Sequence, residues 1–509
     1  MLTALVAAVC VAAVPQPATA SGLPPVTVRV SDTAVSAPVA PGFVGFSFEF
    51  PAVTSYAGSD PGAINPVLVQ LIRDVAPGRS PVLRIGGNST DTSWWPAPGV
   101  AITPGITFTL TPNWLATTRA LAEATGARLI LGLNLKLDSV AEEYAEARAY
   151  QQWIGSRYIA AMEIGNEPEL YQHFPWYLDA GGVPLYARPA SYDFSSYEAD
   201  VSAIAPWLPG LTLAGPATGA APWIAQAGQL FGVERQLKIV TYHRYPLLAC
   251  FTAPGDRQYP SIANLLAVNA ARDLLLGAEP GIRAAHRHGA TFRLDELNSV
   301  ACKGQAGVSD TFASSLWMLD SLFAAARAGV DGVNIHTLPD ADYEPFVFSQ
   351  IDGRWLATVK PVYYALLMFA RAAPPGSRML AVSATPSPDI RERATVAPDG
   401  LIHVVLINDS LTSGHLVRVR PPAPSGATTL VHPSAPAGAA TLERLIAPSA
   451  DATEGVTLAG QTFGNETGTG LLMGTLRRIR IALTRGRYLI QMPASSAALL
   501  TFAPAPTTR

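Results

Sequence analysis

The sequence predicts an α/β fold, a (β/α)8 TIM barrel with a C-terminal β-sandwich domain, and two features of the chain lead to this prediction. From residue 36 to residue 373, eight short apolar runs alternate with longer stretches of helical pattern, as expected of a parallel sheet covered by helices. After Pro374-Pro375-Gly376 the pattern changes to short alternating segments separated by Gly, Pro, Asp and Ser, which is typical of antiparallel strands. The length of 509 residues suits a large barrel plus a second domain.

Each barrel strand is predicted from an apolar run that is followed by a turn or a helical stretch. The expected strands cover residues 43–48, 81–85, 128–133, 158–164, 211–215, 237–242, 291–294 and 332–335. The expected helices cover residues 65–75, 113–125, 139–153, 262–276, 309–328 and 360–371. Ser309 is the expected N-cap of its helix, and Gly329 is expected to end that helix in the left-handed conformation.

The second domain, expected at residues 374–509, is predicted from six alternating segments. They cover residues 401–408, 416–419, 456–458, 479–483, 487–491 and 497–502. Residues 25–33, ahead of the barrel, alternate in the same way, so we expect them to add a strand to the sandwich.

The first residues predict a secretory signal peptide at positions 1–20. The apolar run at 2–14 is about half of the ~20 residues that a membrane-spanning helix needs, and small residues follow it at 18–20. No other segment of the sequence is long and apolar enough to span a bilayer. We therefore expect a secreted, extracellular protein with no membrane association once the signal is removed.

Composition argues against several other classes. The chain is 49% hydrophobic and 14% charged, unlike a disordered chain. Only four of the 35 basic residues are lysine, and the arginines are scattered along the sequence without a basic stripe, so no nucleic-acid partner is expected. The sequence shows neither a His/Cys/Asp cluster with metal-ligand spacing nor a phosphate-binding Gly-rich loop, so no metal and no cofactor are expected.

Two cysteines, Cys250 and Cys302, remain once the signal is removed. An even pair in an oxidising compartment favours a disulfide, and the alternative is two buried free thiols. The two positions lie on the loops after the sixth and seventh predicted strands, which are neighbours in a barrel. The disulfide is therefore favoured.

Two glutamates stand at the ends of predicted strands. Glu167 follows Asn166 at the end of the fourth strand, and Glu296 ends the seventh. The loops after the strands build the active site of such a barrel, so these carboxylates are expected to face each other across its mouth. Two facing carboxyl groups are what retaining glycoside hydrolysis requires. The alternative is that they form ion pairs with Arg84 or Arg293 in the barrel lining.

Five segments in order carry a family resemblance. The stretch MEIGNEP at 162–168 resembles the acid/base motif of clan A retaining glycosidases, especially glycoside hydrolase family 79, which holds heparanases and β-glucuronidases. The segments LRIGGNSTD at 83–91, LGLN at 131–134, TYHRY at 241–245 and SDTFA at 309–313 resemble further parts of that family's barrel.

The resemblance implies a role for each matching residue. Glu167 would be the general acid/base and Glu296 the nucleophile, with Tyr245 orienting Glu296. Asn166 would bind the sugar 2-OH. Glu163, one step deeper in the barrel, would support the site. The residues expected to hold ring hydroxyls are Glu49 and Asn88, and for Glu49 an ion pair at the barrel rim is an equal alternative.

The residues that recognise a uronic-acid carboxylate are less clearly matched. Family members are expected to bind it with a Tyr and Gly-rich loop after strand seven and a Tyr after strand eight. Tyr343 matches the latter, whereas the loop at 300–304 departs from the pattern. Lys303 on that loop is a candidate for the positive partner, or else a solvated surface residue.

Taken together, these features predict a secreted, retaining, exo-acting β-D-glucuronidase whose partner is a glucuronic-acid-containing carbohydrate. The alternatives are a clan A β-glycosidase for a neutral sugar, an endo-acting heparanase-like enzyme, and a non-catalytic carbohydrate-binding protein. The absence of a basic cleft in the sequence pattern argues against the heparanase-like alternative.

Overall fold

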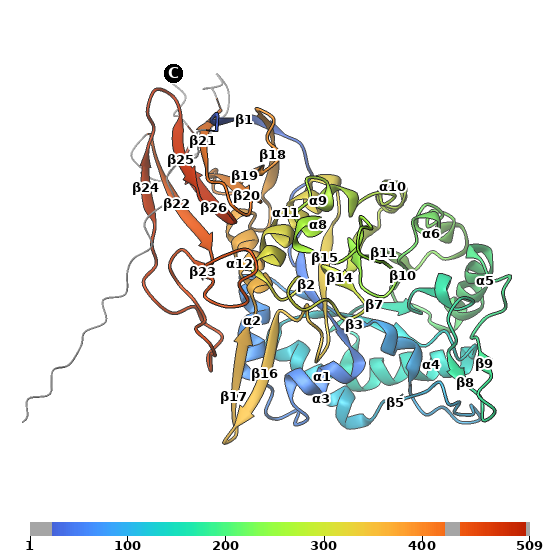
Figure 1. Cartoon of the computed structure of the whole chain (residues 1–509). Helices are drawn as coiled ribbons and strands as arrows, with labels where there is room; N and C mark the ends of the chain where they lie inside the picture. The colour runs from blue at the N-terminus through green and yellow to red at the C-terminus, as the bar shows by residue number, and fades with distance from the viewer. Residues whose placement is uncertain (1–22, 423–437, 505–509) are drawn as a thin grey trace, which may run out of the picture.

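The computed structural model describes residues 23–422 and 438–504. It shows a barrel beside a second, strand-rich domain, with the chain entering and leaving through the second domain (Figure 1). The predicted fold class, a (β/α)8 barrel followed by a β-rich domain, is confirmed.

Eight parallel strands close the barrel in the order β10-β11-β13-β15-β2-β3-β6-β7. Each lies where an apolar run predicts it, because a strand covered by helices on one side and filled with side chains on the other has no face for water. The strands are β2 (Val44–Glu49), β3 (Val82–Gly86), β6 (Arg128–Leu133), β7 (Ile159–Ile164), β10 (Leu213–Thr218), β11 (Leu237–Arg244), β13 (Thr291–Leu297) and β15 (Gly332–Thr337).

Helices surround the strands. The longer ones are α1 (Phe50–Ala57), α2 (Pro66–Asp74), α3 (Pro112–Thr125), α4 (Val140–Ala149), α5 (Phe194–Ile204), α10 (Glu279–Arg287), α11 (Phe312–Ala328) and α12 (Pro361–Ala372). The short ones are η1 (Asn88–Thr92), η2 (Tyr150–Gly155), η3 (Pro168–Leu170), η4 (Ala205–Trp207), α6 (Ala221–Ile224), α7 (Leu230–Val233), α8 (Ile262–Leu265) and α9 (Ala270–Asp273).

Two helix predictions are wrong in detail. Helix α11 begins at Phe312, after Thr311, and not at Ser309. The Ser309 hydroxyl bonds Ser299 Oγ at 3.0 Å and accepts from Gln305 N, so tertiary contacts of the loop take the group that a cap would use. The expected helix at 262–276 is broken into α8 and α9 with turns between them. Gly329 does end α11 in the left-handed conformation, as predicted.

The second domain is one curled sheet of ten strands. The strands are β1 (Val26–Ala34), β18 (Arg378–Ala384), β19 (Ile390–Val396), β20 (Ile402–Asn408), β21 (His415–Arg420), β22 (Ala439–Ile446), β23 (Thr457–Leu458), β24 (Ile479–Ala482), β25 (Tyr488–Met492) and β26 (Ser496–Phe502). Strand β1 lies between β18 and β21. Side chains from both ends of the sheet, such as Val28, Leu500 and Ile490, share one core. The sheet thus encloses a core as a sandwich does, although its hydrogen-bonding path is continuous.

Four two-stranded sheets lie in the loops that follow the barrel strands. They pair β4 (Ser93–Trp94) with β5 (Phe108–Thr109), β8 (Tyr177–Leu178) with β9 (Pro184–Leu185), β12 (Leu247–Leu248) with β14 (Val300–Ala301), and β16 (Phe346–Ile351) with β17 (Arg354–Val359). The β12–β14 pair joins the loops after the sixth and seventh barrel strands.

The two domains share a continuous apolar core. Ile407 of β20, Leu445 of β22 and Leu499 of β26 point away from the inner core of the curled sheet and belong to the same buried cluster as α12. Tyr364 of α12 accepts a hydrogen bond from Phe463 N at 2.9 Å. The second domain is therefore packed against the barrel rather than tethered to it. Within the part of the chain that the structure describes, no helix combines the length and apolar character needed to cross a bilayer.

Truncating this interface is expected to destabilise the protein. Ile407 is fully buried, so Ile407→Ala should lower the free energy of unfolding by about 2–5 kcal/mol, the usual cost of such a cavity. Urea denaturation measures the change. Leu411→Ala, at a position 52% exposed, is the control and should change stability by less than about 0.5 kcal/mol. A loss as small in Ile407→Ala as in the control would contradict the shared core.

Candidate active site

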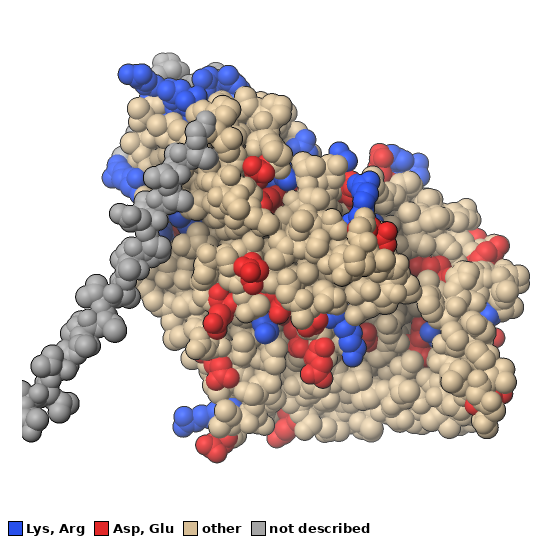
Figure 2. All heavy atoms as spheres, viewed as in Figure 1, with Lys and Arg blue, Asp and Glu red and all other residues tan. Residues whose placement is uncertain are grey.

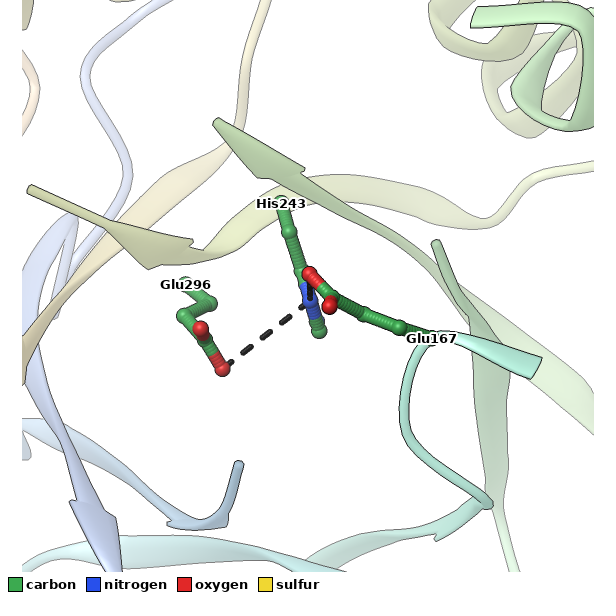
Figure 3. A group of neighbouring side chains, drawn as sticks. All are labelled: Glu167, His243 and Glu296. Carbon is green, nitrogen blue, oxygen red and sulfur yellow. Dashed lines mark hydrogen bonds and ion pairs between the residues drawn. The ribbon is translucent and has the colours of Figure 1, made fainter. Parts of the chain in front are cut away.

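The two predicted glutamates meet at the mouth of the barrel, together with a histidine. Glu296 lies near the C-terminal end of β13, Glu167 lies just after β7, and His243 lies on β11 between them (Figure 3). One carboxylate oxygen of each glutamate and one imidazole nitrogen all lie within 4.8 Å of one another. This is the close spacing of a retaining pair, since inverting enzymes keep their carboxyl groups about 6.5–9.5 Å apart.

The buried guanidinium of Arg84 holds the floor of the site. Its Nη1 donates to Glu296 Oε2 at 2.7 Å, and its Nη2 donates to Asn166 Oδ1 at 2.9 Å. Its Nε lies 2.6 Å from Glu163 Oε2 and 3.0 Å from Asp295 Oδ2. The predicted alternative, an ion pair in the barrel lining, is therefore present for Glu296. It still fits a nucleophile, because the pair keeps that carboxylate charged. Arg293 instead bonds Asn334 and Gly42 O, away from both glutamates.

Glu296 is held ready in its ionised form. Burial alone would raise its pKa, but His336, His243 and Arg84 outweigh burial, so the pKa of Glu296 lies well below its usual value. Tyr245 Oη donates to Glu296 Oε1 at 2.9 Å, which fixes the second oxygen. Both oxygens therefore have partners in the protein, as the orienting role predicted for Tyr245 requires.

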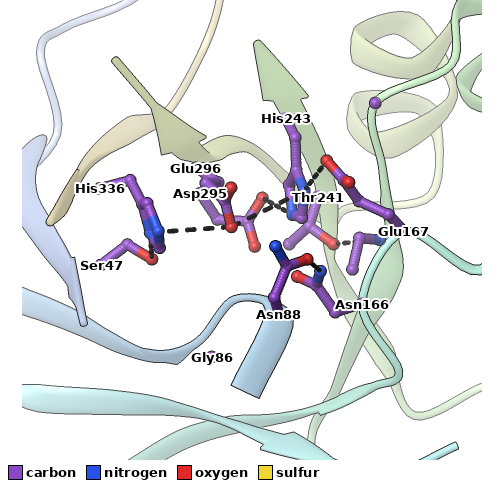
Figure 4. A network of polar contacts seen from close by, with 12 residues as sticks. Ser47, Gly86, Asn88, Asn166, Glu167, Thr241, His243, Asp295, Glu296 and His336 are labelled. Carbon is purple, nitrogen blue, oxygen red and sulfur yellow. Dashed lines mark hydrogen bonds and ion pairs between the residues drawn. The ribbon is translucent and has the colours of Figure 1, made fainter. Parts of the chain in front are cut away.

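Glu167 has a different environment from Glu296. Its side chain is 22% exposed, and its carboxylate contacts His243 Nδ1 at 3.1 Å, with no arginine among its described ion-pair partners. The backbone of Glu167 has a φ of 48°, and its N–H donates to Ala217 O at 2.8 Å. Ala217 N in turn donates to Thr241 Oγ1, so strands β10 and β11 fix the turn that presents Glu167 to the mouth (Figure 4).

His243 links the two carboxylates and was not among the predicted site residues. Burial would lower its pKa, but Glu296 and Asp295 raise it well above the usual value, so the imidazole holds its proton. Its Nε2 lies 3.6 Å from Asp295 Oδ1. The signal was available in the sequence: His243 lies two residues before Tyr245, so the role predicted for Tyr245 at the site places His243 on the same side of the strand.

Asn166 and Asn88 form the amide side of the site. Asn166 Nδ2 donates to Asn88 Oδ1 at 3.3 Å, while its Oδ1 accepts from Arg84 (Figure 4). Asn166 is buried and Asn88 is exposed to the mouth. This arrangement leaves Asn88 free to meet a ligand and orients the Asn166 amide toward the glutamates.

The carboxylate of Glu49 accepts hydrogen bonds from other residues of the protein. It accepts from Asn88 N at 3.1 Å, from Ser89 N at 2.7 Å and from the Ser89 hydroxyl, and lies 3.5 Å from His336 Nε2. Gly87 makes this approach possible, because a Cβ there would lie 2.5 Å from Glu49 Oε1. Glu49 thus holds the loop after β3 and contacts His336, which is close to the rim ion pair considered as its alternative.

The loops after β13 and β15 hold the remaining predicted residues. Tyr343 is buried, with its ring centroid 6.3 Å from that of Tyr245 and 6.0 Å from that of His336. Lys303 is exposed, and its carbonyl accepts from Asp342 N, next to Tyr343. A disulfide joins Cys250 to Cys302 with a Cα–Cα distance of 6.1 Å. It ties the loop after β11 to the loop that follows Glu296.

The same three side chains, Glu167, His243 and Glu296, also offer the donor types of a metal site. Their donor atoms, however, already contact one another and Arg84 and Tyr245. The arrangement therefore favours proton transfer and nucleophilic attack by the carboxylates. With a closed barrel, an ionised glutamate and a second glutamate within 4.8 Å, the fold and site define a glycoside hydrolase.

Comparisons with known proteins agree with this class. Residues 394–499 match the model of the glycosyl hydrolase family 79 C-terminal beta domain. A β-glucuronidase of Neurospora crassa is 22% identical over 456 residues, covering 78% of each chain. A β-glucuronidase of Aspergillus niger is 25% identical over 428 residues, covering 75% of this chain and 74% of that protein. The predicted resemblance to glycoside hydrolase family 79 is thus confirmed, and the chain is a glycoside hydrolase.

Solved structures share the fold. A 4-O-α-L-rhamnosyl-β-D-glucuronidase from Fusarium oxysporum 12S superimposes with a TM-score of 0.65 at 19% identity, covering 93% of this chain and 100% of that one. A family 51 arabinofuranosidase from Xanthomonas axonopodis pv. citri gives a TM-score of 0.65 at 12% identity, covering 94% and 99%. At these identities the comparison establishes the architecture and leaves the substrate to the site.

Replacing Glu163 tests which of the carboxyl groups around Arg84 are ionised. Burial raises the pKa of Glu163 to about 8 against the opposing effect of Arg84, so the folded barrel favours its protonated form. Such a group contributes stability that is present below its unfolded pKa of about 4.5 and is lost as the pH rises toward 8. We expect the free energy of unfolding of Glu163→Gln to fall less steeply over this range than that of wild type.

Urea denaturation at about pH 5 and about pH 8 measures the two slopes. Glu123→Gln, at a side chain that is 59% exposed, is the matched control and should follow wild type. A Glu163→Gln protein with the wild-type slope would show that Glu163 is ionised throughout.

Proposed function

We propose that this protein is an exported, exo-acting, retaining β-D-glucuronidase. The observation that carries the reaction type is the pair of carboxylate oxygens of Glu167 and Glu296 within 4.8 Å. The sugar is supported by the two fungal relatives, both named β-glucuronidase, which match about three quarters of the chain.

The geometry supports a two-step mechanism. Glu296, kept ionised by Arg84, His243 and His336, attacks the anomeric carbon and forms a glycosyl ester as the bond to the aglycone breaks. Glu167 gives its proton to the departing glycosidic oxygen. A water molecule then loses a proton to Glu167 and attacks the same carbon, which releases Glu296 and the sugar with its original configuration. His243 keeps its hydrogen bond to Glu167 in both steps.

Recognition of the sugar 2-OH is assigned to Asn166. Its Oδ1 accepts from Arg84 and its Nδ2 is shared with Asn88, so the amide is oriented before a ligand enters. An oriented amide strengthens its bond to the 2-OH as positive charge develops on the sugar ring.

The carboxylate of the sugar is assigned to Tyr343 and Lys303. Tyr343 packs beside Tyr245 and His336, so its phenol lies at the same side of the mouth as the nucleophile. Lys303 is exposed on the loop that the Cys250–Cys302 disulfide anchors, and its backbone bonds the segment that carries Tyr343. A lysine there supplies the positive charge that a uronate requires and a neutral sugar does not.

Export is supported by two features. Residues 1–20 carry the apolar run and small-residue stretch of a secretory signal. The disulfide between Cys250 and Cys302 fits an oxidising compartment.

Removing the acid/base is expected to separate the two steps. Glu167→Ala should hydrolyse a phenyl β-D-glucuronide about 10²–10⁴-fold more slowly than wild type, because the phenolate then leaves unprotonated. A 2,4-dinitrophenyl glucuronide, whose leaving group needs no proton, should still form the glycosyl ester. Added azide should then replace water in the second step and yield the β-glucuronyl azide, identified by NMR.

Glu296→Ala is the paired variant. Here azide should attack the anomeric carbon directly and give the α-azide, since the inverted product follows from a single displacement. The same azide anomer from both variants, or wild-type rates in either, would refute the assignment of the two glutamates.

The carboxylate assignment predicts a change in substrate preference. Lys303→Gln should lower kcat/KM for an aryl β-D-glucuronide by about five- to tenfold and leave the slow hydrolysis of the matching glucoside unchanged. Lys238→Gln, at an exposed position where β11 begins at the far end of the barrel, is the control. Equal effects on glucuronide and glucoside would remove Lys303 from carboxylate recognition. A wild-type preference for the glucoside would discard the uronate substrate and keep the two-glutamate mechanism.

A further inference from the structure

Arginines gather on the second domain, away from the barrel mouth. Residues 374–509 contain 12 arginines and 8 acidic residues, whereas the whole chain has a net charge of −3. Figure 2 shows the basic side chains collected at the end of this domain, over the region of β1, β21 and β25. These arginines are scattered along the sequence, and the sheet brings residues that are far apart in the sequence onto one surface.

Three of these arginines form a row across three neighbouring strands. Arg29 of β1 is paired with Arg420 of β21 in the parallel register. Val419 of β21 is paired with Tyr488 of β25, so Arg420 and Arg487 come next in the same antiparallel register. The flanking residues Val28, Val419 and Tyr488 are buried in the inner core, which places Arg29, Arg420 and Arg487 on the outer face. We call these three residues the arginine row.

Two further arginines extend the basic face. Arg418 lies two residues before Arg420, on the same side of β21, and Arg485 is exposed in the turn that precedes β25. Adjacent strands are about 4.8 Å apart, so the arginine row spans about 10 Å and offers several guanidinium groups to one extended ligand.

The arginine row has no acidic partner among the described residues. No ion pair within the described residues, 23–422 and 438–504, involves the arginines of this face, which are Arg29, Arg418, Arg420, Arg485 and Arg487. Residues 423–437, which connect β21 to β22, contain no Asp or Glu. The Nε of Arg487 is buried and without a hydrogen-bond partner in the described structure.

Arginines elsewhere in this domain behave differently. Arg391 pairs with Asp409 at 3.1 Å and Arg393 with Asp320 at 2.6 Å, where the domain meets the barrel. Those arginines stabilise the fold. Like charges placed opposite each other on neighbouring strands destabilise a sheet, so the arginine row has no comparable structural benefit. An anionic ligand on the outer face would relieve the repulsion.

We propose that the outer face of β1, β21 and β25 is a docking surface for an anionic polysaccharide that carries uronic-acid carboxylates. The proposal rests on the proposed function, since a glucuronidase meets such polymers as substrates. A guanidinium group binds a carboxylate through two parallel hydrogen bonds, and a row of three can hold consecutive carboxylates of one chain. Docking there would raise the local concentration of chain ends near the barrel without contacting the catalytic residues.

The test uses the full signal-free chain and polyglucuronic acid, with neutral dextran as the uncharged control. The triple variant Arg29→Gln, Arg420→Gln, Arg487→Gln removes the row. The matched control removes three arginines, Arg79, Arg119 and Arg235, that are exposed on the barrel and have no described ion pair. Calorimetric titration at about 0.02 M and about 0.15 M salt measures binding, because a charge-driven surface weakens as salt rises.

We expect wild type and the barrel control to bind polyglucuronic acid alike, and the row variant to bind it at least about tenfold more weakly at low salt. All three proteins should hydrolyse an aryl β-D-glucuronide at the same rate, because the row lies outside the active site. Equal binding by the row variant and the barrel control would overturn the docking surface.

A second arm uses vesicles of phosphatidylglycerol. Tighter binding of wild type to these vesicles than to polyglucuronic acid, lost in the row variant, would overturn the proposal in favour of an anionic lipid surface. Failure of every protein to cleave the aryl glucuronide would count against the proposed function alone, since the binding measurements do not depend on turnover.

Discussion

The buried guanidinium of Arg84 is the interaction on which the active site depends. A positive charge inside a barrel is tolerated only when it is fully paired, and Arg84 finds its partners on three strands: Glu163 on β7, Asp295 and Glu296 on β13, and Ser47 on β2. The same group bonds Asn166. One side chain therefore sets the charge of the Glu296 carboxylate and the orientation of the neighbouring amide, and it couples both to the closure of the barrel.

The alternation of side chains along the barrel strands brings the residues of the site together. Alternate residues of β11 point inward, so Thr241 supports the turn before Glu167 and His243 reaches its carboxylate. Tyr245, after the strand, reaches Glu296. The two glutamates differ because their surroundings differ. Glu296 is enclosed by cations and ionised, whereas Glu167 is partly exposed beside one imidazole. This difference of environment supports the opposite roles that we propose for two identical side chains.

Arginines of the second domain and its interface occur in two different environments. Where the curled sheet meets the barrel, arginines are paired with carboxylates across the interface, as in Arg393 with Asp320 and Arg371 with Glu443. On the outer face, the arginines of β1, β21 and β25 have no such partners among the described residues. The outer face of the sheet thus packs against the barrel at β20, β22 and β26, through Ile407, Leu445 and Leu499, and presents charge at β1, β21 and β25.

The sequence alone determined the barrel, because eight apolar runs separated by helical stretches leave few other ways to bury a parallel sheet. It also determined the two glutamates and Tyr245, which stand at strand ends next to recognisable motifs. The tertiary structure decided the rest. For Glu49 the sequence left a sugar contact and a rim ion pair as equal alternatives, and the structure shows its carboxylate accepting from the amides of Asn88 and Ser89, since Gly87 lets the loop approach it. Ser309 was expected to cap a helix and bonds Ser299 instead. The partners of His243 and Asp295, and the alignment of Arg29 with Arg420, join strands that are distant in the chain. Local pattern reports which face a side chain occupies, whereas its partners depend on strand register and closure, which only the folded chain fixes.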